Sequence, residues 1–181
     1  MSRVTLLDSS NAPAASQPLL AQIQAAFQST PNMFRAVANS PVALQSMWAA
    51  FGALGQGTLG AALGEKIAVA VANRNRCEYC LAAHTALGKA AGVTAADMQA
   101  AQSAESDDPR TAAALRFALR MVEQRAAVGE AEVQRLRDAG FDDGQIVEII
   151  AHVALNLFTN YINVALDVPV DFPRVELRAA A

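Results

Sequence analysis

The feature that most constrains this chain is the segment EKIAVAVANRNRCEYCLAAHT, which runs from Glu65 to Thr85. It contains both cysteines of the protein and one of its two histidines. An apolar run that ends at Ala72 is followed by the polar sequence NRNR and then by a second, largely apolar run. Two such runs around a short polar break are typical of an antiparallel helix pair. The segment therefore predicts a helical hairpin that turns near residues 73–76.

The spacing of four residues suggests a reactive site on this hairpin. Cys77, Cys80 and His84 follow one another at intervals of three and four residues, so they share one face of the second helix. Glu65 lies about as far before the turn as His84 lies after it, and we expect the antiparallel pair to bring the two together. His84 is then placed to take the proton of Cys80 through a hydrogen bond or one water. A carboxylate, an imidazole and a thiol in this order form a base-activated nucleophile with an orienting group.

The residues beside the cysteines also favour a reactive thiol. Asn75 is a good N-cap candidate, which places Cys77 in the first turn of the second helix, where free backbone N–H groups and the helix dipole stabilise a thiolate. Arg74 and Arg76 add positive charge nearby. A thiolate with a second thiol one turn away can attack a peroxide, become a sulfenic acid and condense to a disulfide.

The Glu65…Cys77-x-x-Cys80-x-x-x-His84 constellation resembles that of the AhpD-like alkylhydroperoxidases in the carboxymuconolactone decarboxylase superfamily. The resemblance covers about residues 43–92 well and the rest of the chain loosely. It implies that Cys80 attacks the peroxide and that Cys77 resolves the sulfenic acid. It also implies that Glu65 and His84 form the proton relay. The best-known peroxidases of the family carry a histidine just before the second cysteine, where this chain has a tyrosine.

The chemistry implied by this resemblance needs substrates rather than a cofactor. A hydroperoxide oxidises the cysteine pair, and a dithiol protein, a lipoylated protein or a small thiol must then reopen the disulfide. Members of the family assemble as homo-oligomers. The hydrophobic content of 53% and the positive mean hydropathy are compatible with apolar surface that other subunits cover.

Other uses of the same residues stay open at this stage. Cys77, Cys80, His84 and Glu65 are also a possible zinc ligand set, although the chain has one C-x-x-C pair where structural zinc sites usually have two. Inert buried cysteines and a core histidine are further alternatives. Haem attachment is excluded, because Leu81 rather than a histidine follows the second cysteine. A lactone decarboxylase of the same superfamily is the alternative enzyme, and a redox-sensing or zinc-binding interaction protein is the non-enzymatic alternative.

Composition excludes several classes of protein. The net charge of −3 and the pI near 5.3 argue against nucleic-acid binding, which normally requires a basic face. No stretch approaches 18 uninterrupted apolar residues, so no membrane span is predicted. The N-terminal sequence lacks the apolar core of a signal peptide. The two cysteines are too close in sequence to form a structural disulfide that closes a long loop. We therefore expect a cytoplasmic protein with a redox-active pair.

The rest of the chain predicts helices and no strands, and hence an all-α fold in a single domain over residues 1–181. Further helices are expected at 18–28, from the Thr30-Pro31 and Ser40-Pro41 pairs, at 94–104, 109–127 and 130–139, and from Asp142 or Asp143 onward. An irregular arm is expected at 1–15. The irregular tail at 169–181 is a candidate to embrace a neighbouring subunit.

The last long helix carries the second histidine and a group of polar residues. His152 has apolar neighbours, so a core histidine with one hydrogen bond is favoured over a second catalytic base. Asn156, Asn160, Tyr161 and Asn163 are expected to line a pocket or to form a polar network between helices.

Overall fold

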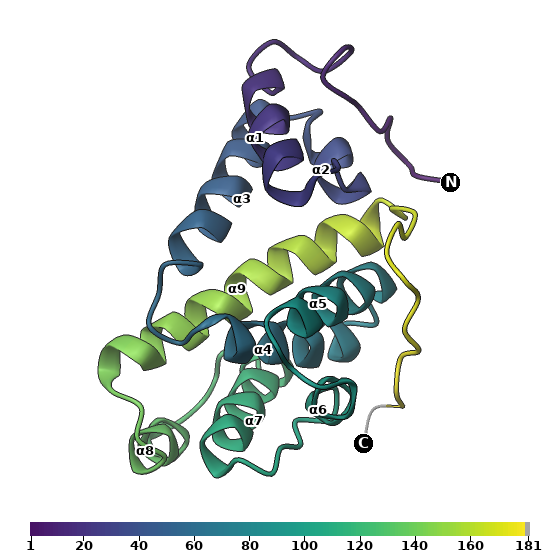
Figure 1. The fold of residues 1–181 in the computed structure, drawn as a ribbon. Helices are drawn as coiled ribbons and strands as arrows, with labels where there is room; N and C mark the ends of the chain where they lie inside the picture. The colour runs from purple at the N-terminus through teal and green to yellow at the C-terminus, as the bar shows by residue number, and fades with distance from the viewer. Residues whose placement is uncertain (180–181) are drawn as a thin grey trace.

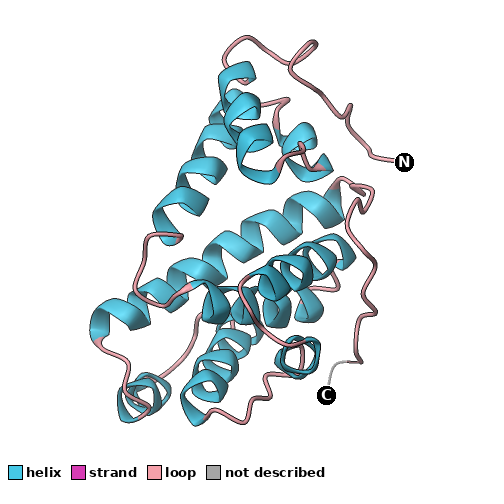
Figure 2. Ribbon diagram, viewed as in Figure 1, coloured by secondary structure: helices cyan, strands magenta, loops and turns pink. Residues whose placement is uncertain are grey.

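The computed structural model describes residues 1–179, and in this part of the chain it contains nine α-helices and no strand (Figure 2). The all-α prediction is therefore confirmed. The helices are α1 (Gln17–Phe27), α2 (Asn32–Val37), α3 (Pro41–Leu54), α4 (Ala61–Arg74), α5 (Glu78–Ala90), α6 (Ala95–Ala101), α7 (Pro109–Glu123), α8 (Glu130–Asp138) and α9 (Asp143–Ala165).

Most helix starts follow the predicted caps. Ser40 Oγ accepts the N–H of Ala43 at 3.3 Å, and Asp142 Oδ1 accepts the N–H of Gln145 at 2.8 Å. The Thr30-Pro31 prediction is wrong by one position, because Pro31 itself is the N-cap of α2 and offers no side-chain cap. The predicted ends at 104 and 127 are also too late. The chain takes left-handed backbone angles at Ala104, Arg125 and Ala126, which a right-handed helix cannot contain.

Helix α4 lies at the centre of the molecule and contacts α5, α6, α7 and α9 (Figure 1). Its residues from Ile67 to Ala72 are at most 2% exposed, because neighbours surround the helix on all sides. A helix that is apolar all round is a buried core helix. Helix α5 runs back along α4 after a tight turn, so the predicted hairpin forms the centre of the core.

Helices α1, α2 and α3 gather at one end of the molecule, above the long helix α9 that crosses it (Figure 1). Four aromatic side chains hold them together: the ring of Phe34 lies within 6.0 Å of those of Phe27, Trp48 and Phe51, centroid to centroid. This cluster faces the hairpin, where it forms one wall of the site described below.

Both terminal segments pack on the molecule's own helices. In the N-terminal arm, the N–H of Arg3 donates to the carbonyl of Leu166 at 2.8 Å. The C-terminal segment after α9 runs back beside α5 (Figure 1), and the N–H of Arg178 donates to Asn73 Oδ1 at 2.9 Å. The predicted contact of the tail with a neighbouring subunit stays a prediction, and its last residues, 180–181, lie outside the described part. Within residues 1–179, no helix combines the length and the apolar character that crossing a bilayer demands.

Candidate active site

The turn between α4 and α5 differs from the prediction in one detail that matters for the chemistry. Asn75 is not the N-cap of α5 but the C-cap of α4, and its side-chain amide donates to Asn160 Oδ1 at 2.9 Å. Arg76 takes a left-handed φ of 56°, and α5 begins two residues later than a cap at Asn75 would allow. Cys77 is therefore the N-cap, and its Sγ accepts the backbone N–H of Cys80 at 3.4 Å.

The two arginines beside the cysteines do not supply the positive charge that the sequence suggested. Arg74 forms an ion pair with Glu123 at 3.2 Å. Arg76 donates to the carbonyl of Arg178 at 2.8 Å. Both side chains bind other partners. The pKa values of the two thiols therefore depend on groups of α5 and α9.

The hairpin brings Glu65 beside His84, as its geometry predicted. His84 Nδ1 and Glu65 Oε2 are 2.7 Å apart, and the two side chains are 11% and 21% exposed. Burial alone lowers the pKa of His84, but the charge and hydrogen bond of Glu65 outweigh it and raise the pKa above its ordinary value. The pair therefore favours a protonated imidazole close to the cysteines.

Cys80 is the thiol whose surroundings favour its ionised form. Its Sγ accepts a hydrogen bond from Asn163 Nδ2 at 3.2 Å and lies 3.9 Å from Thr159 Oγ1. Burial raises the pKa of Cys80, but the hydrogen bond from Cys77, the charge of His84 and these two polar groups outweigh it and lower the pKa to about 6.

Cys77 has the opposite character. Its hydrogen bond to Cys80 and its burial both raise its pKa, so it keeps its proton while Cys80 ionises. The helix-dipole argument from sequence favoured a thiolate at Cys77, and the structure reverses it. Cys77 sits at the cap with one backbone N–H on its sulfur, whereas Cys80 receives charged and polar groups from α5 and α9.

A cavity of about 190 Å³ is lined by Cys80, Glu65 and His84. The rest of its lining is mostly apolar and comes from α1, α2, α3, α5 and the C-terminal segment: Phe27, Pro31, Met33, Phe34, Phe51, Tyr79, Ala83, Leu87 and Phe172. No lysine or arginine lines it. The cavity thus presents an apolar surface to a ligand beside the buried Cys80 and His84 side chains.

A second cavity, of about 140 Å³, lies on the other side of the Glu65–His84 pair, and His152 lines it. The interpretation of His152 as an enclosed core residue with one hydrogen bond is wrong. Its ring is half-buried, and within the described residues no side-chain hydrogen bond holds it. A Cβ on Gly64 would lie 3.0 Å from its Cε1 atom, so the glycine lets α9 bring the imidazole up to the turn of α4 that carries Glu65. Burial lowers the pKa of His152.

Both the hairpin and the whole fold are similar to those of known proteins. The model of the carboxymuconolactone decarboxylase family matches residues 42–124, which include all four predicted site residues. A structure described as an alkylhydroperoxidase AhpD core, an uncharacterized peroxidase-related protein from Ralstonia eutropha JMP134, superposes with a TM-score of 0.86 at 26% identity. That match covers 94% of this chain and 92% of the other. Residues 42–124 thus match the carboxymuconolactone decarboxylase family, and the chain as a whole is similar in structure to an AhpD core protein.

Two further similar structures define how far the likeness extends. An uncharacterized peroxidase-related protein from Silicibacter sp. TM1040 has a TM-score of 0.79 at 27% identity, over 93% of this chain and 91% of the other. The debrominase Bmp8 in complex with 2,3,4-tribromopyrrole also has a TM-score of 0.79, at 21% identity and with 94% of each chain covered. At that identity the likeness to the debrominase shows a shared fold. The search of curated proteins found no match.

Tyr79, which stands where the best-known peroxidases of the superfamily carry a histidine, has a structural contact instead. Its hydroxyl accepts the N–H of Met33 at 3.1 Å, and its ring packs edge-on against Phe172 at 5.8 Å between centroids. Burial raises the pKa of Tyr79. The residue therefore ties α5 to α2 and to the C-terminal segment, and it is not placed to carry protons near neutral pH.

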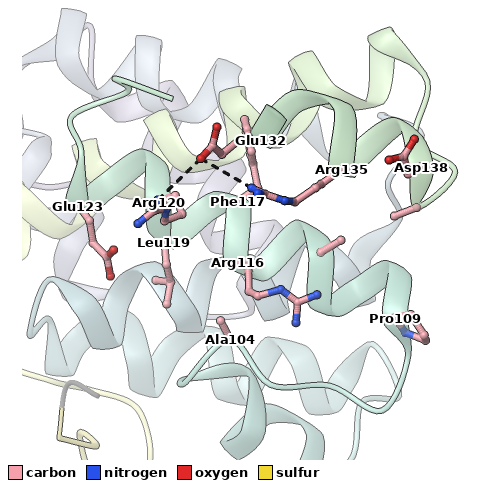
Figure 3. Close-up of a pocket in the computed structure, with 12 residues that line it drawn as sticks. Ala104, Pro109, Arg116, Phe117, Leu119, Arg120, Glu123, Glu132, Arg135 and Asp138 are labelled. Atoms are coloured by element: carbon pink, nitrogen blue, oxygen red, sulfur yellow. Dashed lines mark ion pairs between the residues drawn. The ribbon is translucent and has the colours of Figure 1, made fainter. Parts of the chain in front are cut away.

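The largest cavity described lies elsewhere. It has a volume of about 720 Å³ between α7 and α8, and Figure 3 shows its charged lining, in which Glu132 pairs with Arg120 and Arg135 at 3.7 Å. No cysteine or histidine lines it. Within residues 1–179, no group of three or more His, Cys, Asp and Glu side chains is arranged to hold a metal ion, so the zinc hypothesis has no ligand set there.

Sequence reasoning missed two parts of the site. Thr159 is absent from the predicted site residues, and Asn163 is predicted only as one member of a polar group on the last helix. The spacing of Thr159 and Asn163, one helical turn apart on α9, places both on one face, which is the signal that the sequence offered for them.

Proposed function

We propose that the protein reduces organic hydroperoxides, with Cys80 as the attacking thiolate, Cys77 as the resolving thiol, and Glu65 and His84 as the proton relay. One observation carries this proposal. The thiol with the lowered pKa lines an apolar cavity, and the Glu65–His84 pair lines the same cavity. An apolar cavity that holds a thiolate and a proton donor has the two groups that heterolysis of an O–O bond requires.

In the first step, the Cys80 thiolate attacks one peroxide oxygen and the O–O bond breaks. The sulfur is oxidised to the sulfenic acid, and the leaving alkoxide takes the proton of the His84 imidazolium to form an alcohol. Glu65 holds the ring by its hydrogen bond at Nδ1, which leaves Nε2 as the atom that transfers the proton. Asn163 and Thr159 stabilise the thiolate before the attack.

In the second step, Cys77 attacks the sulfenic sulfur of Cys80. A disulfide bond forms, the S–OH bond breaks, and the proton of Cys77 leaves with the hydroxide as water. The existing contact between Cys77 Sγ and the backbone N–H of Cys80 holds the resolving sulfur next to its target. A dithiol then returns both cysteines to the thiol state.

The cavity supports a small organic peroxide as substrate. Its volume of about 190 Å³ is below the range of about 300–1,000 Å³ that is usual for drug-sized ligands. Its aromatic and aliphatic walls gain from contact with an alkyl or aryl group. We therefore expect a small alkyl or aryl hydroperoxide to react faster than hydrogen peroxide.

The lactone decarboxylase alternative is less well supported by the same cavity. A carboxymuconolactone carries carboxylates, and an anionic substrate needs Arg or Lys partners or backbone N–H groups in a dry site. The cavity has no Arg or Lys side chain, and its one cation, the His84 imidazolium, is already paired with Glu65.

Assembly and location are part of the same proposal. Exposed apolar side chains lie along α9, with Val147 64%, Ile150 36% and Tyr161 63% exposed, and we propose that they contact further subunits. A Tyr161→Asp variant then sediments as a smaller species than the wild type, and equal sedimentation would contradict this contact. A cytoplasmic location, where thiols are kept reduced, suits a buried cysteine pair that must be recycled.

A thiol count tests the proposed reaction. Fully reduced protein is titrated before and after one equivalent of cumene hydroperoxide, alongside Cys77→Ser and Cys80→Ser variants. We expect the wild type to lose both thiols, Cys77→Ser to give a trappable sulfenic acid, and Cys80→Ser to keep its thiol. Survival of both wild-type thiols would show that the relay does not activate Cys80, and lactone substrates would be tested next.

A further inference from the structure

A second opening reaches the cysteine pair at Cys77, and Tyr79 lines both this opening and the apolar cavity. This Cys77 groove has a volume of about 350 Å³ and lies between the start of α5, the end of α9 and the C-terminal segment. Its lining includes Arg76, Cys77, Glu78, Asn163, Asp167 and Arg174. It adjoins a second groove of about 550 Å³, whose lining shares Arg76, Glu78, Val170 and Arg174. Cys80 lines the apolar cavity and not this groove.

A buried polar atom between the two openings lacks a partner. Asn163 is 3% exposed and lines the Cys77 groove, while its Nδ2 donates to Cys80 Sγ on the other side. Its Oδ1 atom accepts no hydrogen bond from the described residues. An unsatisfied buried acceptor costs about 1–3 kcal/mol. A ligand in the groove that brings an S–H or N–H donor would satisfy this atom.

The two sulfurs also differ as leaving groups. Attack on a disulfide is fastest when the expelled thiol has the lower pKa. The pKa of Cys80 is lowered by its hydrogen bonds and the charge of His84, whereas the pKa of Cys77 is raised by its contact with Cys80 and by burial. Attack at Cys77 Sγ therefore expels the better leaving group, and the groove offers access on that side.

We propose that a dithiol reductant enters through the Cys77 groove and attacks Cys77 Sγ, so that peroxide and reductant reach the cysteine pair through separate openings. This inference rests on the proposed function, because it concerns the step that regenerates the thiols. It assigns a binding site to the second substrate of the cycle.

The step balances as two thiol–disulfide exchanges. The first thiolate of the reductant forms a bond to Cys77 Sγ, and the Cys77–Cys80 bond breaks with its electron pair on Cys80. The second thiol of the reductant then attacks the reductant's first sulfur, which is bonded to Cys77 in the mixed disulfide. The bond to Cys77 Sγ breaks, and Cys77 takes the proton of the second thiol. The reductant is oxidised to a cyclic disulfide, and the protein gains two electrons. A dithiol suits this groove because its second attack is intramolecular, so no second reductant molecule has to enter.

Regiochemical mapping tests the inference without relying on peroxidase activity. The protein is oxidised to the disulfide with diamide and then treated briefly with glutathione as a monothiol probe in the presence of iodoacetamide. Mass spectrometry should find glutathione on Cys77 and carbamidomethyl on Cys80. Glutathione on Cys80 in half or more of the molecules would overturn the inference.

A pair of matched variants tests the groove itself. Val170→Trp places an indole in the groove, and Val42→Trp makes the same change at an exposed position of α3 that lines none of the cavities described here. We expect Val170→Trp to slow dithiothreitol reduction of the diamide-formed disulfide at least tenfold and to leave cumene hydroperoxide oxidation unchanged. Val42→Trp should change neither rate. Reduction of Val170→Trp at the wild-type rate, in protein with the wild-type circular dichroism spectrum, would contradict the proposed entry.

Leu87→Trp provides the reciprocal test, because Leu87 lines the apolar cavity and not the groove. It should slow oxidation by cumene hydroperoxide and leave dithiothreitol reduction unchanged. Slowing of both steps would contradict separate openings. The two proposals fail separately: loss of the peroxide reaction with glutathione still on Cys77 removes the proposed function, and glutathione on Cys80 with normal peroxide turnover removes only this inference.

Discussion

The small cavity at Cys80 and the large cleft between α7 and α8 differ in what their walls contain. The cleft has about 720 Å³ of space, and its charged side chains are either paired with one another or exposed (Figure 3). The cavity has about 190 Å³, but Cys80 and His84 in its lining are buried and shift each other's pKa values. Burial strengthens each charge–charge interaction, because little solvent screens it. Under the proposed function, the reactive site is marked by buried groups that shift each other's pKa values. The volume of a cavity does not mark it.

The largest effect that this comparison predicts is at the thiolate itself. Cys80→Ser should lower hydroperoxide turnover by about a thousandfold or more, because a serine hydroxyl is hardly ionised near neutral pH and is a much weaker nucleophile. Arg116→Ala, in the cleft, should change turnover less than twofold. Both rates come from a coupled assay with cumene hydroperoxide and dithiothreitol. A large loss in Arg116→Ala would break the comparison.

The next effect concerns the proton donor. His84→Gln removes the charge that helps to lower the pKa of Cys80 and also the acid that protonates the alkoxide, so we expect about a hundredfold loss at pH 7. Glu65→Gln should lose about tenfold, because the imidazole stays but loses the carboxylate that favours its protonated form. Single-turnover oxidation measures both. A larger loss in Glu65→Gln than in His84→Gln would contradict the assigned order of the relay.

A smaller effect is expected from the hydrogen bond to the thiolate. Asn163→Ala removes the 3.2 Å contact, and a rise of about one unit in the pKa of Cys80 follows. Because the thiolate fraction rises with pH through that pKa, the loss in oxidation rate should be about fivefold at pH 6 and about twofold at pH 7. A loss that does not depend on pH would show that Asn163 acts only by packing.

The smallest effect on activity is expected at Tyr79. Tyr79→Phe removes the hydroxyl that accepts the buried N–H of Met33, so the free energy of unfolding should fall by about 1–3 kcal/mol. Turnover at a temperature well below the transition should stay within about twofold of the wild type. Urea unfolding measures the first quantity and the coupled assay the second. A turnover loss as large as that of His84→Gln would make Tyr79 part of the proton relay.

The hairpin was predictable because its signals are local. Helix periodicity and one polar break determine that Glu65 meets His84. The side chains of Ser40, Thr94 and Asp142 each cap a helix by accepting a backbone N–H three residues further along the chain. The prediction of Asn75 as N-cap is wrong because Arg76 has a left-handed backbone, so the cap falls on Cys77. The sequence does not reveal that backbone conformation.

The remainder of the site depends on contacts between residues far apart in sequence. Asn163 and Thr159 reach Cys80 from α9, and Phe172 closes the cavity from the C-terminal segment. The thiol pKa values depend on these contacts as well as on the cap. Helix-dipole reasoning therefore favoured a thiolate at Cys77, whereas these contacts lower the pKa of Cys80 and raise that of Cys77.

The most direct test of this account measures which cysteine ionises. Reduced, metal-free protein is alkylated with limiting iodoacetamide from pH 4.5 to pH 9.5, and the rate at each cysteine is followed by peptide mass spectrometry. The account predicts that Cys80 reacts first, with a rate that rises with pH to a plateau and a midpoint near pH 6. Faster alkylation of Cys77, or a Cys80 midpoint between pH 8 and pH 9, would contradict it.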